Sequence, residues 1–354
     1  MVRERQSNIE ALRIVCMLFI VMHHSIAHGL SLSEQYVPQM GWEWDFTQLI
    51  NAFCYCAVNV FILISGYFGI KPKVKSFANL YLMLGFYVFV LYHAYLYVTG
   101  GAVNRWSLLY AIMPVSYAPG WWFIKCYVLL YLVSPILNAA IGTFDRKRFQ
   151  WVLILLMIVN LYFGFYRNWD FANYGFSISH FIFMYFIGAF IHKYDKAWRR
   201  KFIVRQSQYI YIIGSVILGL LTILNVKYWH NTTSAWLYTV NYNHPLLILN
   251  SIGIFLFFLS LGFRSRVINY VAPSVLAVYL IHECEWFSSS YYEMVARCWE
   301  SCPEGILRFL FLFVWCIGVF LISVAVDQLR KIVTKPIVEK VEGLYQKCKD
   351  KWRQ

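Results

Sequence analysis

Long apolar runs recur along the whole chain, and they restrict its fold more than any other feature. Of the 354 residues, 60% are hydrophobic and only 14% are charged. A helix needs roughly 20 consecutive apolar residues to cross a bilayer, and several runs approach or exceed that length. Every backbone group in the hydrocarbon region must be hydrogen-bonded within the protein, which helices achieve locally. We therefore predict an all-α, polytopic membrane protein.

The apolar runs predict ten membrane spans, and an even number of spans places both termini on the same side. A basic segment with helical spacing of apolar residues follows the last span. It predicts an amphipathic helix on the inner membrane surface. We therefore expect a membrane domain at 1–327 and a basic cytoplasmic tail at 328–354. The ten predicted spans are 8–30, 47–69, 77–99, 121–142, 149–166, 178–193, 207–226, 245–263, 270–290 and 305–326.

The distribution of basic residues predicts the orientation. With a cytoplasmic N-terminus, 24 of the 31 lysines and arginines fall in inner segments. Such a bias is the positive-inside rule, so both termini are predicted to be cytoplasmic. We expect the membrane to be a bacterial inner or plasma membrane. The same bias explains the net charge of +14 without a nucleic-acid partner.

The first predicted span carries polar side chains that are expensive in a membrane. Arg13 and His24 are eleven residues apart, which on a helix places them on about the same face and roughly 16 Å apart. His23 points elsewhere. Intramembrane polar residues are functional candidates, and Glu10 on the same helix is a possible second-site residue. The alternative is that Arg13 reaches the headgroups and His24 is an interior polar residue.

A basic loop follows the second span on the predicted inner face. Ser65 and Gly66 lie near that face, at about the depth of Arg13. Together with this arginine, the loop forms a cluster suited to a phosphate-bearing ligand. The alternative is ordinary positive-inside bias with lipid headgroups as counterions. The lysines of this loop are Lys71, Lys73 and Lys75.

Later spans hold four further possible second-site residues. Trp122 and Lys125 lie in the fourth span, where Lys125 is close enough to the outer boundary to reach water. His282 and Glu283 are adjacent in the ninth span, and an intramembrane histidine beside a carboxylate is a functional candidate. His24 and His28 have the spacing of a helical metal pair, but no HExxH is present, so no metal is predicted.

Motifs for other chemistries are absent from the sequence. No GxGxxG, P-loop or GxSxG pattern occurs, which argues against nucleotide hydrolysis and a soluble-type lipase site. A neutral histidine can act as a general base toward a hydroxyl, and an arginine can hold phosphate. Acyl-coenzyme A carries phosphates at one end and a reactive group at the other, so its shape fits the helical spacing of Arg13 and His24.

Four segments resemble the integral-membrane acyltransferase family three. RIVCMLFIVMHH at 13–24 matches its Arg, ten residues, His signature, and FILISGYF at 61–68 resembles its Ser-Gly-aromatic motif. WWFIKCYVLLYLVSPIL at 121–137 and LAVYLIH at 276–282 resemble its later segments. The resemblance implies transfer of an acyl group, usually acetyl, from cytoplasmic acyl-coenzyme A to a hydroxyl of an extracytoplasmic or lipid-linked carbohydrate of the cell envelope.

Roles for individual residues follow from this resemblance. His24 would be the catalytic histidine, Arg13 would hold the coenzyme A phosphates, and Ser65, Gly66 and Tyr67 would shape the donor tunnel. Direct transfer and a transient acyl-histidine are both open as routes. The alternative function is a membrane transporter or flippase whose midplane polar residues line a path. The acceptor and the oligomeric state are left open by the sequence.

Overall fold

Helices joined by turns and short irregular segments form the described part of the computed structural model. The structure describes residues 5–30, 41–103, 109–110, 112–116, 120–194, 201–228 and 241–351, although not the side chains of 201–205 and 351. No strand occurs within these ranges. The predicted all-α fold class is therefore confirmed.

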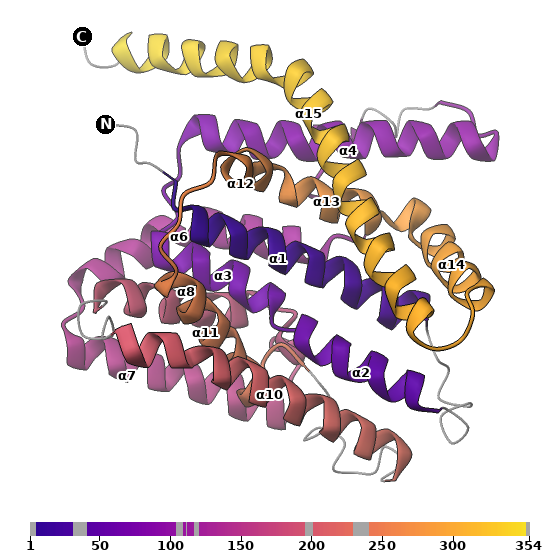
Figure 1. The fold of residues 1–354 in the computed structure, drawn as a ribbon. Coiled ribbons are helices and arrows are strands. Elements are labelled where there is room, and N and C mark those ends of the chain that lie inside the picture. Colours follow the sequence, from indigo (N-terminus) through magenta and orange to yellow (C-terminus); the bar gives the residue numbers. More distant parts are fainter. Residues whose placement is uncertain are drawn as a thin grey trace.

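The helices are named by their order in the chain (Figure 1). Helices α1, α3, α8, α11 and α13 pack around one another, and α15 crosses α4 at the edge of the bundle. They are α1 (Ser7–His24), η1 (Ser25–Gly29), α2 (Trp42–Cys54), α3 (Ala57–Phe68), α4 (Val74–Thr99), α6 (Trp122–Thr143), α7 (Arg146–Ile158), η3 (Val159–Tyr166), η4 (Asn173–Gly175), α8 (Ile178–Lys193), α10 (Lys201–Lys227), α11 (Pro245–Ser260), α12 (Arg266–Val271), η6 (Ala272–Ser274), α13 (Val275–His282), α14 (Glu285–Ser301) and α15 (Ile306–Lys351).

The described helices account for the predicted spans. Seven are long and apolar enough to cross a membrane, and an eighth span is present if a bent pair is counted as one. Two of the predicted spans correspond to shorter apolar helices, α8 and α11. Helix α1 begins and α15 ends on the same side of the bundle, as an even number of crossings requires (Figure 1).

The ninth predicted span, 270–290, is wrong as a continuous helix. The segment Arg266–His282 and helix α14 meet at an angle of 87°. Helix α13 ends at His282, and Cys284 has the extended backbone angles φ −72° and ψ 117°. A broken helix at membrane depth is tolerated where other protein groups satisfy the freed backbone. The break brings Glu283 close to α1.

The last predicted span and the tail helix form one long element. Helix α15 runs without interruption from Ile306 to Lys351 and includes Pro336. The predicted boundary at 327/328 therefore lies inside this helix. Its C-terminal part packs beside the start of α4, where Lys75 forms an ion pair with Glu342 at 2.6 Å.

Glycines allow α3 and α8 to approach closely. A Cβ on Gly66 would overlap the backbone of Tyr185 on α8, and a Cβ on Gly188 would overlap the backbone of Leu63 on α3. Small residues at helix contacts are the usual means of close packing within membranes. The packing of α3 on α8 matters for function because α3 forms one wall of the site described below.

Replacement of Gly66 by alanine is therefore expected to destabilise the fold. The new methyl group meets backbone rather than a flexible side chain, so α3 and α8 must separate, and overpacking of this kind typically costs about 1–3 kcal/mol. Thermal unfolding in detergent, followed by size-exclusion chromatography, measures the loss. Gly142→Ala on α6 is the matched control, because nothing lies within 4 Å of its added Cβ. Equal midpoints for the two variants would contradict this account.

Candidate active site

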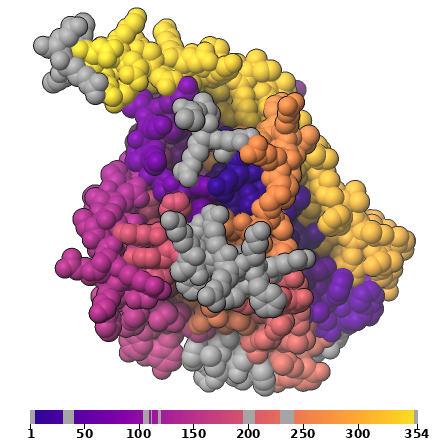
Figure 2. All heavy atoms as spheres, turned by 60° about the vertical axis from the view of Figure 1, so that its left-hand side comes forward, coloured from indigo at the N-terminus to yellow at the C-terminus, as the bar shows by residue number. Residues whose placement is uncertain are grey.

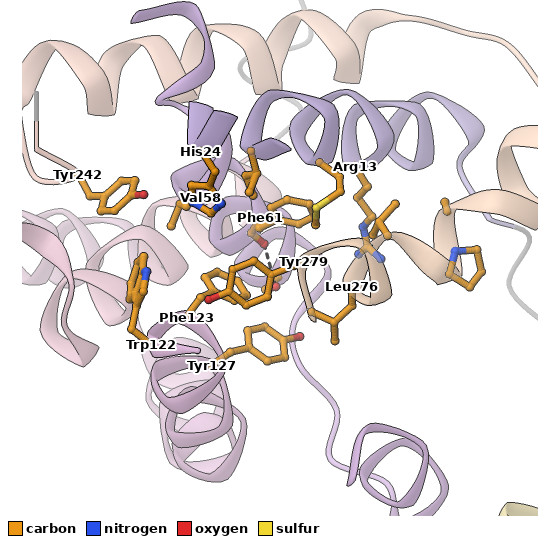
Figure 3. A pocket seen from close by; sticks show the side chains of 16 residues that line it. Arg13, His24, Val58, Phe61, Trp122, Phe123, Tyr127, Tyr242, Leu276 and Tyr279 are labelled. Atoms are coloured by element: carbon orange, nitrogen blue, oxygen red, sulfur yellow. Dashed lines mark hydrogen bonds between the residues drawn. The ribbon is translucent and has the colours of Figure 1, made fainter. Parts of the chain in front are cut away.

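A narrow cavity lies between α1, α3, α6 and α13. It encloses about 200 Å³ and is lined mainly by apolar and aromatic side chains. Arg13 lies toward one end, Trp122 and Tyr242 lie at the other, and His24 lies between them (Figure 3). The predicted common face of Arg13 and His24 is thus one wall of this cavity. Apolar pockets with a few converging polar groups are typical ligand sites.

His24 is held from behind by two side chains at the broken span. Its Nδ1 atom lies 2.8 Å from Oε2 of Glu283 and 3.0 Å from Nε2 of His282. The same Glu283 oxygen accepts a hydrogen bond of 2.6 Å from the hydroxyl of Tyr292. The first and ninth predicted spans therefore supply one connected polar group.

The contacts assign the hydrogen positions on both rings. Nδ1 of His282 lies 2.6 Å from the carbonyl oxygen of Val278, which can only accept, so this nitrogen carries the hydrogen. Nε2 of neutral His282 is then an acceptor. Nδ1 of His24 faces this acceptor and the Glu283 carboxylate, so it must donate. Nε2 of neutral His24 is left unprotonated, on a ring that lines the cavity.

The backbone changes its winding directly after His24. Residues Ser25–Gly29 form a π-helical turn, a feature that often occurs at functional sites. The Ser25 hydroxyl lies 3.0 Å from the hydroxyl of Tyr291 on α14, which ties this turn to the far side of the break. His23 points away from the cavity, and its Nδ1 lies 2.7 Å from Oδ1 of Asn51.

Two buried polar groups on the cavity wall lack hydrogen-bond partners within the described part of the chain. They are the hydroxyl of Tyr279 and Nε of Arg13. Glu10 forms an ion pair with Arg13 at 3.9 Å, which is too long for a hydrogen bond. Unsatisfied buried donors are rare in native proteins, so both groups are suited to contact a ligand.

Residues from the Ser-Gly-aromatic motif lie on different sides of α3. Ser65 lines the cavity, and its hydroxyl donates to the carbonyl of Phe61 at 2.9 Å. Gly66 faces α8, and Tyr67 is buried with its ring 5.4 Å from that of Phe255. Only Ser65 of the three predicted tunnel residues is in contact with the cavity.

The predicted lysines do not line this cavity. Lys71 and Lys73 are exposed on the segment before α4, and Lys75 lines a different cavity between α4 and α15. Lys125 is exposed on α6, whereas the nearby Trp122 faces the cavity. Their ligand-binding roles remain predictions from the sequence.

The polar group behind His24 also has the composition of a metal site. One ligand atom each from His24, His282 and Glu283 lies within 4.8 Å of the others. His28, which has metal-pair spacing from His24 in the sequence, is not a member of this group. Direct hydrogen bonds of 2.8 and 3.0 Å satisfy the same atoms, and the expectation of a metal-free site stays a prediction.

Comparison with known proteins supports the resemblance seen in the four motifs. The model of the acyltransferase domain of family 3 matches residues 6–328, a range that includes all four segments. No curated protein and no solved structure matches the chain.

Proposed function

Because the chain belongs to acyltransferase family 3, we propose that it transfers an acetyl group from acetyl-coenzyme A to a carbohydrate hydroxyl, with His24 as general base. The observation that carries this proposal is the pair of acceptors on Nδ1 of His24, which leaves Nε2 as the basic atom at the cavity. The carbohydrate would be extracytoplasmic or lipid-linked, and the membrane a bacterial inner or plasma membrane.

The shape of the cavity supports a slender donor. Its mainly apolar walls and volume of about 200 Å³ suit an acyl chain and the thin arm that bears the thioester. Arg13 offers a guanidinium whose Nε has no hydrogen-bond partner in the described part of the chain, at the end that the basic residues assign to the cytoplasm. In the proposed complex, the diphosphate of the donor lies near Arg13 and the thioester lies beside His24.

In the proposed chemical step, His24 takes up one proton from the acceptor and later gives it to the leaving group. Nε2 removes the proton from the acceptor hydroxyl as its oxygen attacks the thioester carbonyl carbon. Glu283 stabilises the imidazolium that forms, since its carboxylate contacts the opposite nitrogen. The carbon–sulfur bond then breaks, and the departing thiolate takes the proton from Nε2. The products are the acyl ester and coenzyme A.

Aromatic side chains at the outer end of the cavity suit the acceptor. The rings of Trp122 and Tyr242 lie 5.4 Å apart, and Phe176 lies 4.5 Å from Trp122. Such rings offer flat apolar faces with a polar edge, which complement the faces and hydroxyls of a sugar. The proposed acceptor therefore enters past Trp122 and meets the thioester at His24.

Tyr279 is proposed to stabilise the oxyanion of the tetrahedral intermediate, because its side chain lines the cavity and its buried hydroxyl has no hydrogen-bond partner among the described residues. Tyr279→Phe is expected to lower kcat about 100-fold, the lower end for loss of one oxyanion donor. The thermal midpoint should stay unchanged, since no protein hydrogen bond is lost. An unchanged kcat in a correctly folded variant would exclude this role.

Labelled acetyl-coenzyme A and the purified protein in lipid nanodiscs test the proposed function. We expect coenzyme A release that requires added carbohydrate acceptor, and label on the acceptor as an alkali-labile ester. Treatment with a chelator should leave turnover unchanged if the group at His24 works through hydrogen bonds alone. Release of coenzyme A without acylated product, or no release with any envelope glycan, would count against the proposal.

A further inference from the structure

A second cavity lies at the inner face of the bundle, between the start of α4 and the C-terminal half of α15. It encloses about 500 Å³, a larger space than the cavity at His24. Pro273 lines both cavities, so the two cavities adjoin at this residue. Atoms of α1 lie in a recess bordered by α4 and the chain around α12, and the end of α15 projects above it (Figure 2).

Four cations line the second cavity. Glu339 is the acidic residue that lines the cavity, and its Oε1 lies 4.0 Å from Nζ of Lys335. Asp327 is fully buried beneath the cavity wall. Glu342 does not line the cavity but forms an ion pair with Lys75. The four cations thus outnumber these three carboxylates. A fifth basic residue, Arg13, lines the neighbouring cavity that Pro273 shares. The four lining cations are Lys75, Arg330, Lys331 and Lys335.

The buried base of this cavity is built to hold its cations in place. Asp327 accepts a hydrogen bond of 2.6 Å from Nε of Arg330 and one of 3.1 Å from the Tyr87 hydroxyl. Its second oxygen lies 3.2 Å from Nζ of Lys331, which also donates to the Ser274 hydroxyl at 2.6 Å. A buried charged group persists only with such partners, and the network fixes Arg330 and Lys331 at the cavity wall.

A fixed arginine beside lysines is the usual protein environment for phosphate groups. The cavity also has enough room for a nucleoside, and Asn79 adds an amide to its wall. The neighbouring cavity is narrow and suits only the arm of the donor. A donor that reached from His24 to Arg13 and beyond would bring its nucleotide end to the segment at Pro273.

We propose that the cavity between α4 and α15 binds the phosphorylated nucleotide end of the acyl donor, with Lys331 and Lys335 facing its ribose 3′-phosphate. This inference rests on the proposed function, which identifies the donor as a coenzyme A thioester. The shared chemistry is a phosphate ester, so a phospholipid headgroup is the competing source. The terminal helix segment is thereby assigned a part in donor binding rather than in membrane attachment alone.

Binding of coenzyme A and 3′-dephospho-coenzyme A to the full chain in nanodiscs tests this inference. Titration calorimetry should show tighter binding of coenzyme A, because charge-assisted contacts to one phosphate contribute about 1.4 kcal/mol, or tenfold in Kd. The variant Lys331→Gln/Lys335→Gln should raise Kd for coenzyme A about tenfold and change that for the dephospho compound less than twofold. Lys335→Gln alone keeps the Asp327 network intact and should give part of the same selective loss.

Lys349→Gln is the matched control, because it removes the same charge from an exposed position on α15 that does not line the cavity. Equal weakening of both compounds by the cavity variants would overturn the assignment. Equal affinity of the wild type for both compounds would do the same. If the lipid headgroup is the true ligand, the variants will instead lose their response to anionic lipid in nanodiscs.

These binding measurements need no turnover, so their outcome is separate from that of the transfer assay. A 3′-phosphate preference that depends on Lys331 and Lys335 in a protein without transferase activity would support the cavity and reject the proposed reaction. Transfer activity without that preference would reject the cavity alone.

Discussion

Replacement of His24 by glutamine is expected to lower kcat for acetyl transfer at least about 1,000-fold, while the Kd for coenzyme A changes less than threefold. A positioned general base contributes roughly 100-fold to 10,000-fold, and the glutamine amide offers no atom that can take a proton at neutral pH. The glutamine amide nitrogen can donate to Glu283 in place of Nδ1 of His24, so the donor cavity keeps its shape. Single-turnover transfer with labelled donor measures this loss.

His23→Gln is the matched control for that prediction. It makes the same substitution one position earlier on α1, where the side chain faces Asn51 instead of the cavity. Its amide can keep a hydrogen bond to Asn51, so transfer should stay within about threefold of the wild type. Comparable losses in the two variants would indicate damage to α1 rather than removal of a base, and would remove the assignment of His24.

The placement of Arg13 and His24 could be predicted because it depends on one helix. The regular rise and twist of α1 decide which residues share a face, and the sequence spacing alone contains that information. The same reasoning separated His23 from His24, and the structure places His23 against Asn51. Apolar run length likewise predicted the all-α fold, because a membrane span depends on local composition.

The partners of His24 could not be predicted because they depend on a break in a distant span. Glu283 lies 259 positions along the chain from His24, and a hydropathy average over 270–290 hides the 87° bend. The pair HisGlu at 282–283 was a signal, but only the end of α13 turns both side chains toward α1. Tyr292 carried no signal, since one tyrosine among the chain's 27 is unremarkable.

Long-range packing also decides which motif residues meet the ligand. Ser65 and Gly66 are neighbours in one motif, yet one faces the cavity and the other faces α8. The basic loop concentrates charge in the sequence, but its lysines divide between solvent and the cavity at α15. That division follows from where α15 crosses α4, which no local pattern encodes.

Replacement of Glu283 by glutamine is expected to lower kcat about 100-fold, less than loss of His24 itself. Oε2 of Glu283 accepts from both His24 and Tyr292, at 2.8 and 2.6 Å. Only the oxygen end of the new amide can accept both hydrogens, so it should occupy that position and keep the hydrogen on Nδ1 of His24. The loss then reflects the missing negative charge behind the imidazolium, about 2.7 kcal/mol of transition-state stabilisation.

Removing the Tyr292 hydroxyl from the Glu283→Gln protein separates two effects. One is the loss of the carboxylate charge, and the other is the position of the hydrogen on the His24 ring. Tyr292→Phe alone should lower kcat less than tenfold, because the carboxylate still accepts from His24. In Glu283→Gln/Tyr292→Phe, one of the two donors that orient the amide is gone, and its nitrogen end can turn toward Nδ1 of His24. The hydrogen of His24 would then move to Nε2 and remove the base, so the combined loss should exceed the product of the single losses and reach about 1,000-fold. Losses that simply multiply would mean that Tyr292 does not orient residue 283, and an undiminished kcat in Glu283→Gln would mean that the carboxylate takes no part in the step.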